Sequence, residues 1–395
     1  MPRRNKLLMI PGPTEVSADV LNTLSLPLPA HYMDAWAEMF NDVTGMLKTL
    51  FGTKSQPFII TGSGSAGLEA AVAAVIEPGD KVAADVTGDD VFAPFVQAHG
   101  AQLVPLEIPP GTALQPERLR EILKKEKDVK AIATCHNITA AGVTNPIKEL
   151  AEVAKEFDAL VLADVISSVG GIELKMDEWG IDICCGATQK AFSVPPGLAL
   201  VAVSDRAWSV AEKRRTRIES EYLNLLRYRE AANPPQSLWH PTPDTCSTLL
   251  VKALQRSLKN LFEEGLGAVY QRHETVGRAV REAMKALGLK LLVADERYAS
   301  NTVTAVRWPS GPDYRKFWRT LYDEFDIMIG NPPISDVRTS TGWFRVGHMG
   351  TTASSKFVLP TLAHLELALS RAGYKVNYGQ GVGAAEKIFE AQTAT

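Results

Sequence analysis

The sequence predicts an α/β protein with a large domain built on a mostly parallel, seven-stranded sheet and a smaller C-terminal α+β domain. Between residues 57 and 205, short apolar runs alternate with longer helical patterns, as they do where parallel strands are joined by helices. After about residue 245 the pattern changes to two long helices and then to a mixed region. The length of 395 residues also suits two domains.

The seven strands are predicted from short apolar segments that are bounded by turn residues. In chain order they cover residues 57–60, 81–85, 102–107, 131–134, 160–163, 181–184 and 198–203. The helices predicted between them cover residues 66–76, 92–99, 116–125 and 147–157. Because a parallel sheet of this kind binds its ligands at the carboxyl ends of the strands, functional residues are expected on the loops at that edge.

The C-terminal part begins with two long helices, predicted over residues 249–264 and 269–287. Strands are predicted near 291–293, 302–306 and 343–346, and helices over 314–324 and about 358–371. We therefore expect an N-terminal arm over residues 1–17, a large domain over 18–275 and a small domain over 276–395.

Composition excludes several classes of protein. Hydrophobic residues make up 45% and charged residues 22% of the chain, and the net charge is −3, so neither long disorder nor nucleic-acid binding is expected. No apolar run approaches the roughly 18 residues that cross a membrane. The four cysteines, Cys135, Cys184, Cys185 and Cys246, show no C-x-x-C spacing, which is typical of a reducing cytoplasm and predicts no metal centre.

A Gly/Ser loop follows the first predicted strand, Thr61-Gly-Ser-Gly-Ser-Ala-Gly67. Backbone N–H groups at a helix N-terminus, with small residues that allow close approach, form a site for a phosphate group. The loop lacks the Gly-Lys-Ser/Thr ending of a Walker loop and the G-x-G-x-x-G spacing. On this segment alone, a phosphate site and a plain strand-to-helix turn are equally good interpretations.

Two further residues follow predicted strands. Asp164 comes after the apolar run 160–163, where its carboxylate either meets a cation or caps a turn. Lys190 follows the strand at 181–184 in Gly186-Ala-Thr-Gln-Lys190, and a partly buried lysine amine is a candidate to form a Schiff base. A lone lysine is usually a surface residue, so the position carries weight only together with the other two features.

Together, the loop, the acid and the lysine match the needs of pyridoxal 5′-phosphate. The loop would hold the phosphate, Asp164 would keep the pyridine nitrogen protonated, and Lys190 would carry the aldehyde. At these residues the chain resembles the class V aminotransferases of the alanine–glyoxylate and serine–pyruvate group, which have the aspartate-aminotransferase-type fold (fold type I). The resemblance extends from Pro11-Gly-Pro-Thr14 to the tail Gly379-Gln-Gly-Val-Gly-Ala-Ala385. Its most specific stretches are Thr61–Glu69, Cys135–Pro146, Asp164–Gly171, Thr188–Gly197 and Arg345-Val-Gly-His-Met-Gly350.

The resemblance implies a role for individual residues. Ser65, Ala66 and Gly67 would form the phosphate cradle with a contribution from Gln189, and Thr139 would lie near the 3′-oxygen. Ile166 would pack on one face of the ring. A partner subunit would add phosphate contacts from a segment matching Trp239-His-Pro-Thr242, which implies a homodimer with shared active sites. Gly12 and Arg345 would bind the substrate, the arginine through a bidentate contact with its carboxylate.

The implied activity is transfer of an amino group from a small amino acid, such as alanine or serine, to glyoxylate or pyruvate. One alternative is pyridoxamine–pyruvate aminotransferase, in which the B6 vitamer is a substrate, although Asp336 stands where a second arginine would be expected. A related class V transaminase of a small amine is a further alternative. Another alternative is a B6-binding protein without catalysis, against which the joint presence of Lys190, Asp164 and Arg345 argues.

Three departures from the family pattern bear on specificity. Ile138 stands where relatives have Glu or Asp. The loop after Gly88 is short, and Phe92 is the nearest candidate for the aromatic residue that stacks on the ring. Residues 331–342, which include Arg338, form an unusual Pro/Ser/Thr-rich loop before Arg345.

Overall fold

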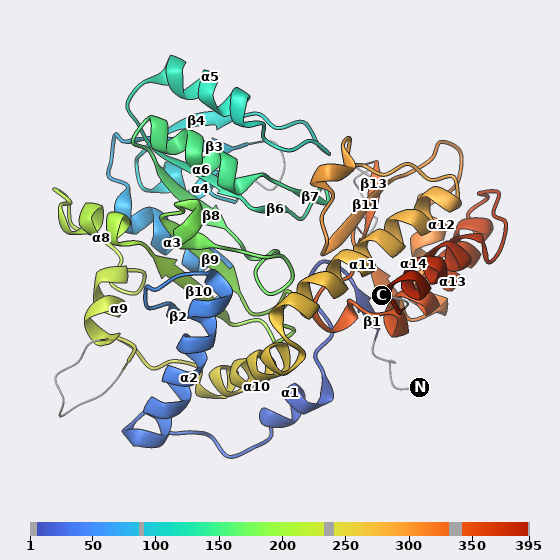
Figure 1. Ribbon diagram of the computed structural model, residues 1–395, viewed down its shortest axis with the longest axis horizontal. Helices are drawn as coiled ribbons and strands as arrows, with labels where there is room; N and C mark the ends of the chain where they lie inside the picture. Colours follow the sequence, from blue (N-terminus) through green and yellow to red (C-terminus); the bar gives the residue numbers. More distant parts are fainter. Residues whose placement is uncertain (1–5, 87–90, 233–240, 332–341, 394–395) are drawn as a thin grey trace.

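The computed structural model describes residues 6–86, 91–232, 241–331 and 342–393. Its centre is a seven-stranded sheet with the order β2-β10-β9-β8-β5-β3-β4 (Figure 1). The strands are β2 (Phe58–Thr61), β3 (Lys81–Asp85), β4 (Gln102–Leu106), β5 (Val129–Cys135), β8 (Leu160–Asp164), β9 (Ile183–Ala187) and β10 (Leu198–Val203). Strand β10 is antiparallel to both of its neighbours, and the other pairs are parallel. The predicted mostly parallel, seven-stranded sheet is therefore confirmed.

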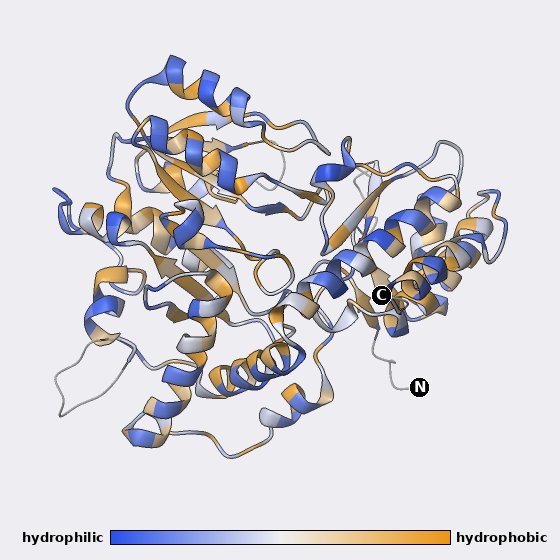
Figure 2. Cartoon of the chain, viewed as in Figure 1, coloured by the Kyte–Doolittle hydropathy of each residue, from blue (hydrophilic) through white to orange (hydrophobic). Residues whose placement is uncertain are grey.

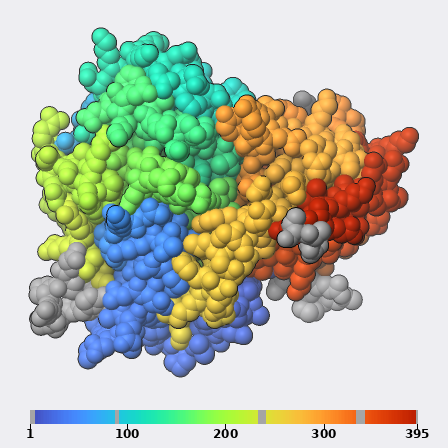
Figure 3. All heavy atoms as spheres, in the orientation of Figure 1, coloured from blue at the N-terminus to red at the C-terminus, as the bar shows by residue number. Residues whose placement is uncertain are grey.

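The inner strands are mostly apolar because the sheet is covered on both faces. In β8, Val161 and Ala163 belong to one core cluster, whereas Leu160 and Leu162 belong to the other. The first face packs against α1 (Ala18–Thr23), α2 (Met33–Phe51), α5 (Pro116–Glu126), α6 (Ile147–Glu156), α7 (Met176–Trp179) and α10 (Thr248–Glu264). The second packs against α3 (Gly64–Val75), α4 (Ala93–Ala98), α8 (Asp205–Glu212) and α9 (Leu225–Ala232). Helices α2 and α10 lie side by side (Figures 1 and 3).

The helices show the complementary pattern of one buried and one exposed side. In α2, the buried positions Trp36, Phe40, Val43 and Leu47 recur at intervals of three or four residues, which places them on one face. Figure 2 shows this alternation as apolar and polar sides on the outer helices, while the central strands are apolar. Residues 18–56, which contain α1 and α2, were not assigned to any element in the sequence analysis.

The small domain is built on short strands that are covered by helices. Strand β11 (Val303–Arg307) pairs antiparallel with β13 (Trp343–Gly347), and β1 (Leu7–Met9) pairs parallel with β12 (Ile327–Ile329). The helices are α11 (Leu266–Ala286), α12 (Tyr314–Arg319), α13 (Ser355–Arg371) and α14 (Gln380–Thr393). The N-terminal arm thus adds a strand to the C-terminal domain, a pairing that was not predicted.

Helix α11 contributes to both domains. Val269, near its beginning, belongs to a core cluster of the large sheet, whereas Val276, Val280 and Met284 belong to the cluster of the small domain. This packing supports our proposal that the small domain begins near residue 276.

Two predictions in the small domain were wrong in detail. Residues 291–293 are not a strand: Leu291 makes a single bridge to Val306. The helix predicted over 314–324 is α-helical only to Arg319, after which Thr320–Glu324 form a π-helical turn.

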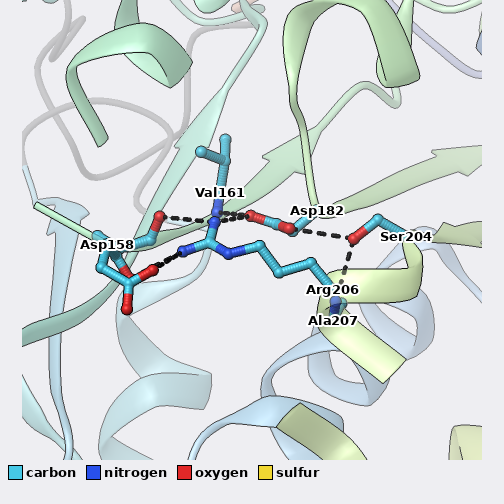
Figure 4. Close-up of polar contacts among 7 residues, drawn as sticks. Asp158, Val161, Asp182, Ser204, Arg206 and Ala207 are labelled. Carbon is cyan, nitrogen blue, oxygen red and sulfur yellow. Dashed lines mark hydrogen bonds and ion pairs between the residues drawn. The ribbon is translucent and has the colours of Figure 1, made fainter. Parts of the chain in front are cut away.

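The amino edge of the sheet is fastened by a polar network centred on the buried Asp182 (Figure 4). The Asp182 carboxylate accepts hydrogen bonds from Val161 N (2.9 Å), Ser204 Oγ (3.0 Å) and Arg206 Nη1 (3.0 Å). Arg206 also contacts Asp158 Oδ1 at 2.9 Å. Burial raises the pKa of Asp182, and these donors oppose the rise. The network joins β8, β9 and α8 at the edge that lies opposite the carboxyl ends of the parallel strands.

Candidate active site

The residues singled out from the sequence gather at the carboxyl ends of the parallel strands. The Gly/Ser loop follows β2, Thr139 lies just beyond β5, Asp164 is the last residue of β8, and Lys190 follows β9. Because β8 lies between β5 and β9, this topology brings the acid, the threonine segment and the lysine segment to one edge. The edge is where open α/β sheets bind their ligands.

Lys190 lies beneath the N-terminal arm. Its Nζ donates a hydrogen bond to the carbonyl oxygen of Pro11. Thr14 fixes the same turn, because Thr14 Oγ1 donates to Lys190 O (2.9 Å) and Thr14 N donates to Gln189 O (3.1 Å). At Gly12, where φ is +125°, a Cβ atom would lie 2.6 Å from Lys190 Cδ. The arm can pass this close to the lysine only because Gly12 has no side chain.

Asp164 is buried at the end of β8, with 8% of its surface exposed. Its Oδ1 accepts a hydrogen bond from Ile166 N at 2.7 Å. The thiol of Cys135, its register partner on β5, lies 3.7 Å from Oδ2 and donates to it. These two contacts fix the position of the carboxylate at this edge.

The Gly/Ser loop forms the first turn of α3. Ser65 is exposed, Ala66 is half-buried and Gly67 is buried. A Cβ atom at Gly64 would lie 2.5 Å from Ile166 Cδ1, and one at Gly67 would lie 3.1 Å from Val201 Cγ2. The small residues therefore allow the amino end of a twelve-residue helix to pack directly against Ile166 and the sheet.

Thr139 and Gln189 lie on the loops that follow β5 and β9. Thr139 Oγ1 donates to Ser167 Oγ at 2.9 Å. The carboxamide oxygen of Gln189 is buried and has no hydrogen-bond partner among the described residues. A buried polar atom without a partner is costly, which makes this side chain a candidate to contact a bound group.

Arg345 reaches the same region from the small domain. It lies on β13, and its Nη1 donates to Thr139 O (3.1 Å) while its Nε donates to Asn331 Oδ1 (2.8 Å). Close by, Trp343 Nε1 donates to Ala140 O at 2.8 Å. The large-domain residues 139 and 140 are thus joined to β13 by two side chains.

The segment expected to serve a partner subunit is described only in part. Trp239 lies outside the described residues, whereas Thr242 is buried and its hydroxyl donates to Asp244 O (2.7 Å). Ser247 N donates to Thr61 Oγ1 (2.9 Å), at the end of β2 in the same chain. Thr242 therefore lies close along the chain to a residue that contacts the start of the Gly/Ser loop.

The departures from the family pattern can be placed in part. Ile138 is buried in the core on the short strand β6 (Asn137–Ile138), which pairs with β7 (Val143–Thr144). Phe92 is also buried, in the core cluster on the α3 side of the sheet. Gly88 lies outside the described residues, as do Asp336 and Arg338 and all of the 331–342 loop except its two ends.

The site also contains contacts that were not predicted. Three residues that contact the site were not named as site residues. They are Cys135, which contacts Asp164, Pro11, whose carbonyl contacts Lys190, and Asn331, which contacts Arg345. Cys135 and Pro11 lie in stretches already recognised as similar to the family, so their positions carried a signal. Asn331 begins the loop that departs from it.

Three buried histidines lie near the site or in the small-domain junction. Burial lowers the pKa of His136 to about 4, and burial with Arg272 or Arg281 nearby lowers the pKa of His273 and His348 to about 3. All three are therefore neutral near pH 7.

Among the described residues, no group of three His, Cys, Asp or Glu side chains could hold a metal ion. Within that same part of the chain, no helix is long and apolar enough to cross a membrane.

This arrangement fits a flat, phosphorylated aldehyde. The amino end of α3 suits a phosphate group, Asp164 offers a carboxylate to a ring nitrogen, Ile166 an apolar surface and Lys190 an amine. The partnerless carboxamide oxygen of Gln189 is a buried acceptor that a hydrogen-bond donor on a bound molecule would satisfy, and the glycines at 12 and 64 let the arm and α3 approach Lys190 and Ile166 closely. A fold and site of this kind define a fold type I aminotransferase.

Comparison with known proteins identifies the family. The family model "Aminotransferase class-V" matches residues 30–329, so the chain belongs to the class V aminotransferases. It is 38% identical to an uncharacterized aminotransferase of Methanocaldococcus jannaschii over 97% of both chains. The family resemblance and the enzyme class predicted from the sequence are thereby confirmed.

Solved structures agree with the fold. The crystal structure of ureidoglycine–glyoxylate aminotransferase from Bacillus subtilis is 32% identical, covers 99% of both chains and superimposes with a TM-score of 0.90. Pyridoxamine–pyruvate aminotransferase from Mesorhizobium loti is 26% identical, with the same coverage and a TM-score of 0.89. These neighbours confirm the fold type I architecture.

Proposed function

We propose that this protein uses pyridoxal 5′-phosphate to transfer an amino group from a small amino acid, alanine-like or serine-like, to glyoxylate or pyruvate. The observation that carries the proposal is the convergence of Lys190, Asp164 and the amino end of α3 at one edge of the sheet, with Arg345 facing them from the small domain. The glyoxylate-specific and pyruvate-specific neighbours support the choice of acceptor.

Each residue of the site would hold one part of the cofactor. Ser65, Ala66 and Gly67 would bind the phosphate together with Gln189, and Thr139 would lie near the 3′-oxygen. Asp164 would contact the pyridine nitrogen, Ile166 one face of the ring, and Lys190 the aldehyde carbon. When bound, the cofactor supplies an electron sink for the carbon that loses a proton.

The remaining chemistry belongs to the chain itself. Lys190 Nζ would take the proton from the substrate's α-carbon and deliver it to the carbon of the cofactor's aldehyde group. The Pro11 carbonyl, which accepts a hydrogen bond from Nζ in this structure, keeps the amine at the same edge as Asp164. Arg345 would bind the α-carboxylate through two parallel hydrogen bonds and so fix the angle of the bond that breaks. Gly12, which lets the arm approach the Lys190 side chain closely, would contact the substrate beside that amine.

A homodimer is part of the proposal, with Trp239 and Thr242 of each subunit completing the phosphate site of the other. One exposed region supports a partner surface. Leu28 is 71% exposed and Met33 is 78% exposed, and Leu26 and Tyr32 between and beside them are exposed as well. A cluster of large exposed apolar residues on one segment is typical of a surface that is covered in the assembly.

A cytoplasmic location stays a prediction.

The second candidate is a pyridoxamine–pyruvate aminotransferase. This candidate is supported by the similarity of the chain to the Mesorhizobium loti enzyme over 99% of its length. The absorbance of the purified protein separates the two, because a prosthetic cofactor gives a band near the visible edge that survives dialysis. Loss of the band on dialysis, with turnover of added pyridoxamine, would favour the second candidate.

A half-reaction screen tests the main proposal. Each of a panel of amino acids is mixed with the cofactor-loaded protein, and the cofactor band is followed. We expect small amino acids to collapse the band, and glyoxylate or pyruvate to restore it. A band that no amino acid changes would overturn the proposal.

A further inference from the structure

The guanidinium of Arg345 contacts acceptors from different domains. Asn331 Oδ1, just beyond β12 in the small domain, accepts from Nε at 2.8 Å. Thr139 O, just beyond β6 in the large domain, accepts from Nη1 at 3.1 Å. Because the guanidinium is planar and its donors point in fixed directions, two acceptors on different nitrogens determine the orientation of the plane.

Asn331 is in turn fixed at both its backbone and its side chain. Its φ is +62°, a left-handed conformation that asparagine tolerates better than most residues. Its backbone oxygen accepts from the Tyr314 hydroxyl, and its Nδ2 donates to Trp343 O at 3.1 Å. Since the amide nitrogen faces a carbonyl, the amide oxygen faces Arg345, and the two ends of the carboxamide cannot exchange without losing both bonds.

The backbone reinforces this placement. Gly330 N donates to Arg345 O at 2.8 Å, and a Cβ atom at Gly330 would lie 3.0 Å from Arg345 Cβ. The same Cβ would lie 3.2 Å from Cδ of Pro11, whose carbonyl contacts Lys190. Asn331 therefore belongs to a tightly packed junction between Arg345 and the arm that covers the lysine.

We propose that Asn331 is a positioning residue that determines how Arg345 meets the substrate's α-carboxylate, an inference that rests on the carboxylate role proposed above for Arg345. Nε has a single N–H, which Asn331 engages, whereas each terminal nitrogen has two, so Nη1 can bind both Thr139 O and a carboxylate. A bidentate contact then uses the two terminal nitrogens, at the end of the guanidinium and not along its Nε edge. The ligand class is a compact 2-amino or 2-oxo monocarboxylic acid, whose α-carbon this geometry directs toward Lys190.

The test uses Asn331→Gly, which removes the carboxamide but keeps a residue that adopts φ near +60° and keeps the carbonyl that binds Tyr314. L-lactate, a 2-hydroxy acid that cannot accept an amino group, is titrated calorimetrically into the cofactor-loaded protein. We expect its Kd to rise about tenfold, the equivalent of one hydrogen bond of about 1.4 kcal/mol. KM for amino acids should rise by a similar factor, with kcat changed less. Retention of the cofactor and turnover of a decarboxylated amine should be unchanged.

Tyr314→Phe is the matched control, because it loosens the backbone of Asn331 and leaves the carboxamide in place. We expect it to bind L-lactate within about twofold of the wild type, well below the loss of one hydrogen bond. Equal weakening in both variants would mean that general anchoring of the loop, and not the carboxamide, matters, and would overturn the proposal. If Asn331→Gly binds L-lactate as the wild type does while Arg345→Lys binds it more weakly, the positioning role of Asn331 is overturned. Wild-type binding in both Asn331→Gly and Arg345→Lys overturns the carboxylate role of Arg345 itself.

Discussion

The two edges of the large sheet each contain a buried aspartate, and the two are held differently. At the amino edge, Asp182 is bound by a backbone N–H, a hydroxyl and the guanidinium of Arg206. At the carboxyl edge, Asp164 is bound by a backbone N–H and the thiol of Cys135. The same edge also contains the amino end of α3, Lys190 and the partnerless oxygen of Gln189, each on a segment that follows a strand.

From this difference we expect Asp182 to contribute mainly to stability and Asp164 mainly to function. A buried carboxylate that is met by a cation and hydrogen-bond donors from the chain itself contributes to holding elements together. We propose that Asp164, at the edge where such sheets bind their ligands, serves a bound group instead. The same substitution at the two aspartates should therefore damage different properties.

Asp164→Asn gives the largest expected effect on activity. The amide cannot keep a ring nitrogen protonated, so we expect kcat to fall roughly 10²–10³-fold, as for the loss of one preorganised electrostatic contact in other enzymes. The melting temperature should change little, because the neutral amide is less costly to bury than the carboxylate. Single-turnover absorbance kinetics measure the rate, and wild-type kcat in this variant would remove Asp164 from the site.

Arg345→Lys is expected to lower kcat/KM for amino acids roughly tenfold to a few hundredfold. The lysine keeps the charge but loses the planar pair of donors, a difference of about 1.5–3 kcal/mol for charge-assisted hydrogen bonds. Steady-state kinetics with an amino acid and with its decarboxylated amine make the comparison. Equal losses for both substrates would show that the arginine does not bind the carboxylate.

Asp182→Asn is the counterpart at the amino edge. The contact with Arg206 loses its charge, and either Val161 N or Ser204 Oγ loses an acceptor. We expect the free energy of unfolding in urea to fall by about 1.5–3 kcal/mol, with kcat unchanged in the folded protein. A variant that is fully stable but inactive would reverse our assignment of the two edges.

The pH dependence of stability gives the smallest expected effect per residue. His136, His273 and His348 have folded-state pKa values of about 4, 3 and 3, against 6.5 when unfolded. The unfolded chain therefore binds more protons below pH 6.5, so stability present above that pH is lost as the pH falls toward the folded-state values. Between about pH 7.5 and 5.5 each histidine should lower the free energy of unfolding by about 1.4 kcal/mol.

The control for this prediction is His348→Gln, measured by urea unfolding at both pH values. We expect it to reduce the pH-dependent loss by about the contribution of one histidine, whatever its effect on stability at neutral pH. The same pH-dependent loss in the variant and in the wild type would show that His348 is not a buried neutral group.

Sequence reasoning predicted the strands best, because their signal is local. The run at 160–163 is apolar at every position since alternate residues enter opposite cores, and the strand that forms there ends at Asp164 as its position after the run indicated. The site segments were predicted for a related reason. Each directly follows such a strand, and parallel strands bring their carboxyl ends together.

Other features had no local signal. Strand β1 has three residues, and its partner β12 lies more than 300 positions away, so no short pattern predicts the pairing. The contacts of Arg345 with Asn331 and Thr139 join two domains and depend on how these dock. Helix α2 is a different case, because the spacing of Trp36, Phe40, Val43 and Leu47 did carry a helical signal that was overlooked.

The central claim is that Lys190 forms the covalent link to the cofactor at the carboxyl edge of the sheet. Borohydride reduction of the cofactor-loaded protein, followed by proteolysis and mass spectrometry of the peptides, tests it most directly. The account predicts one reduced adduct, on Lys190, and none in Lys190→Ala. An adduct on another lysine, or wild-type transamination by Lys190→Ala, would contradict it.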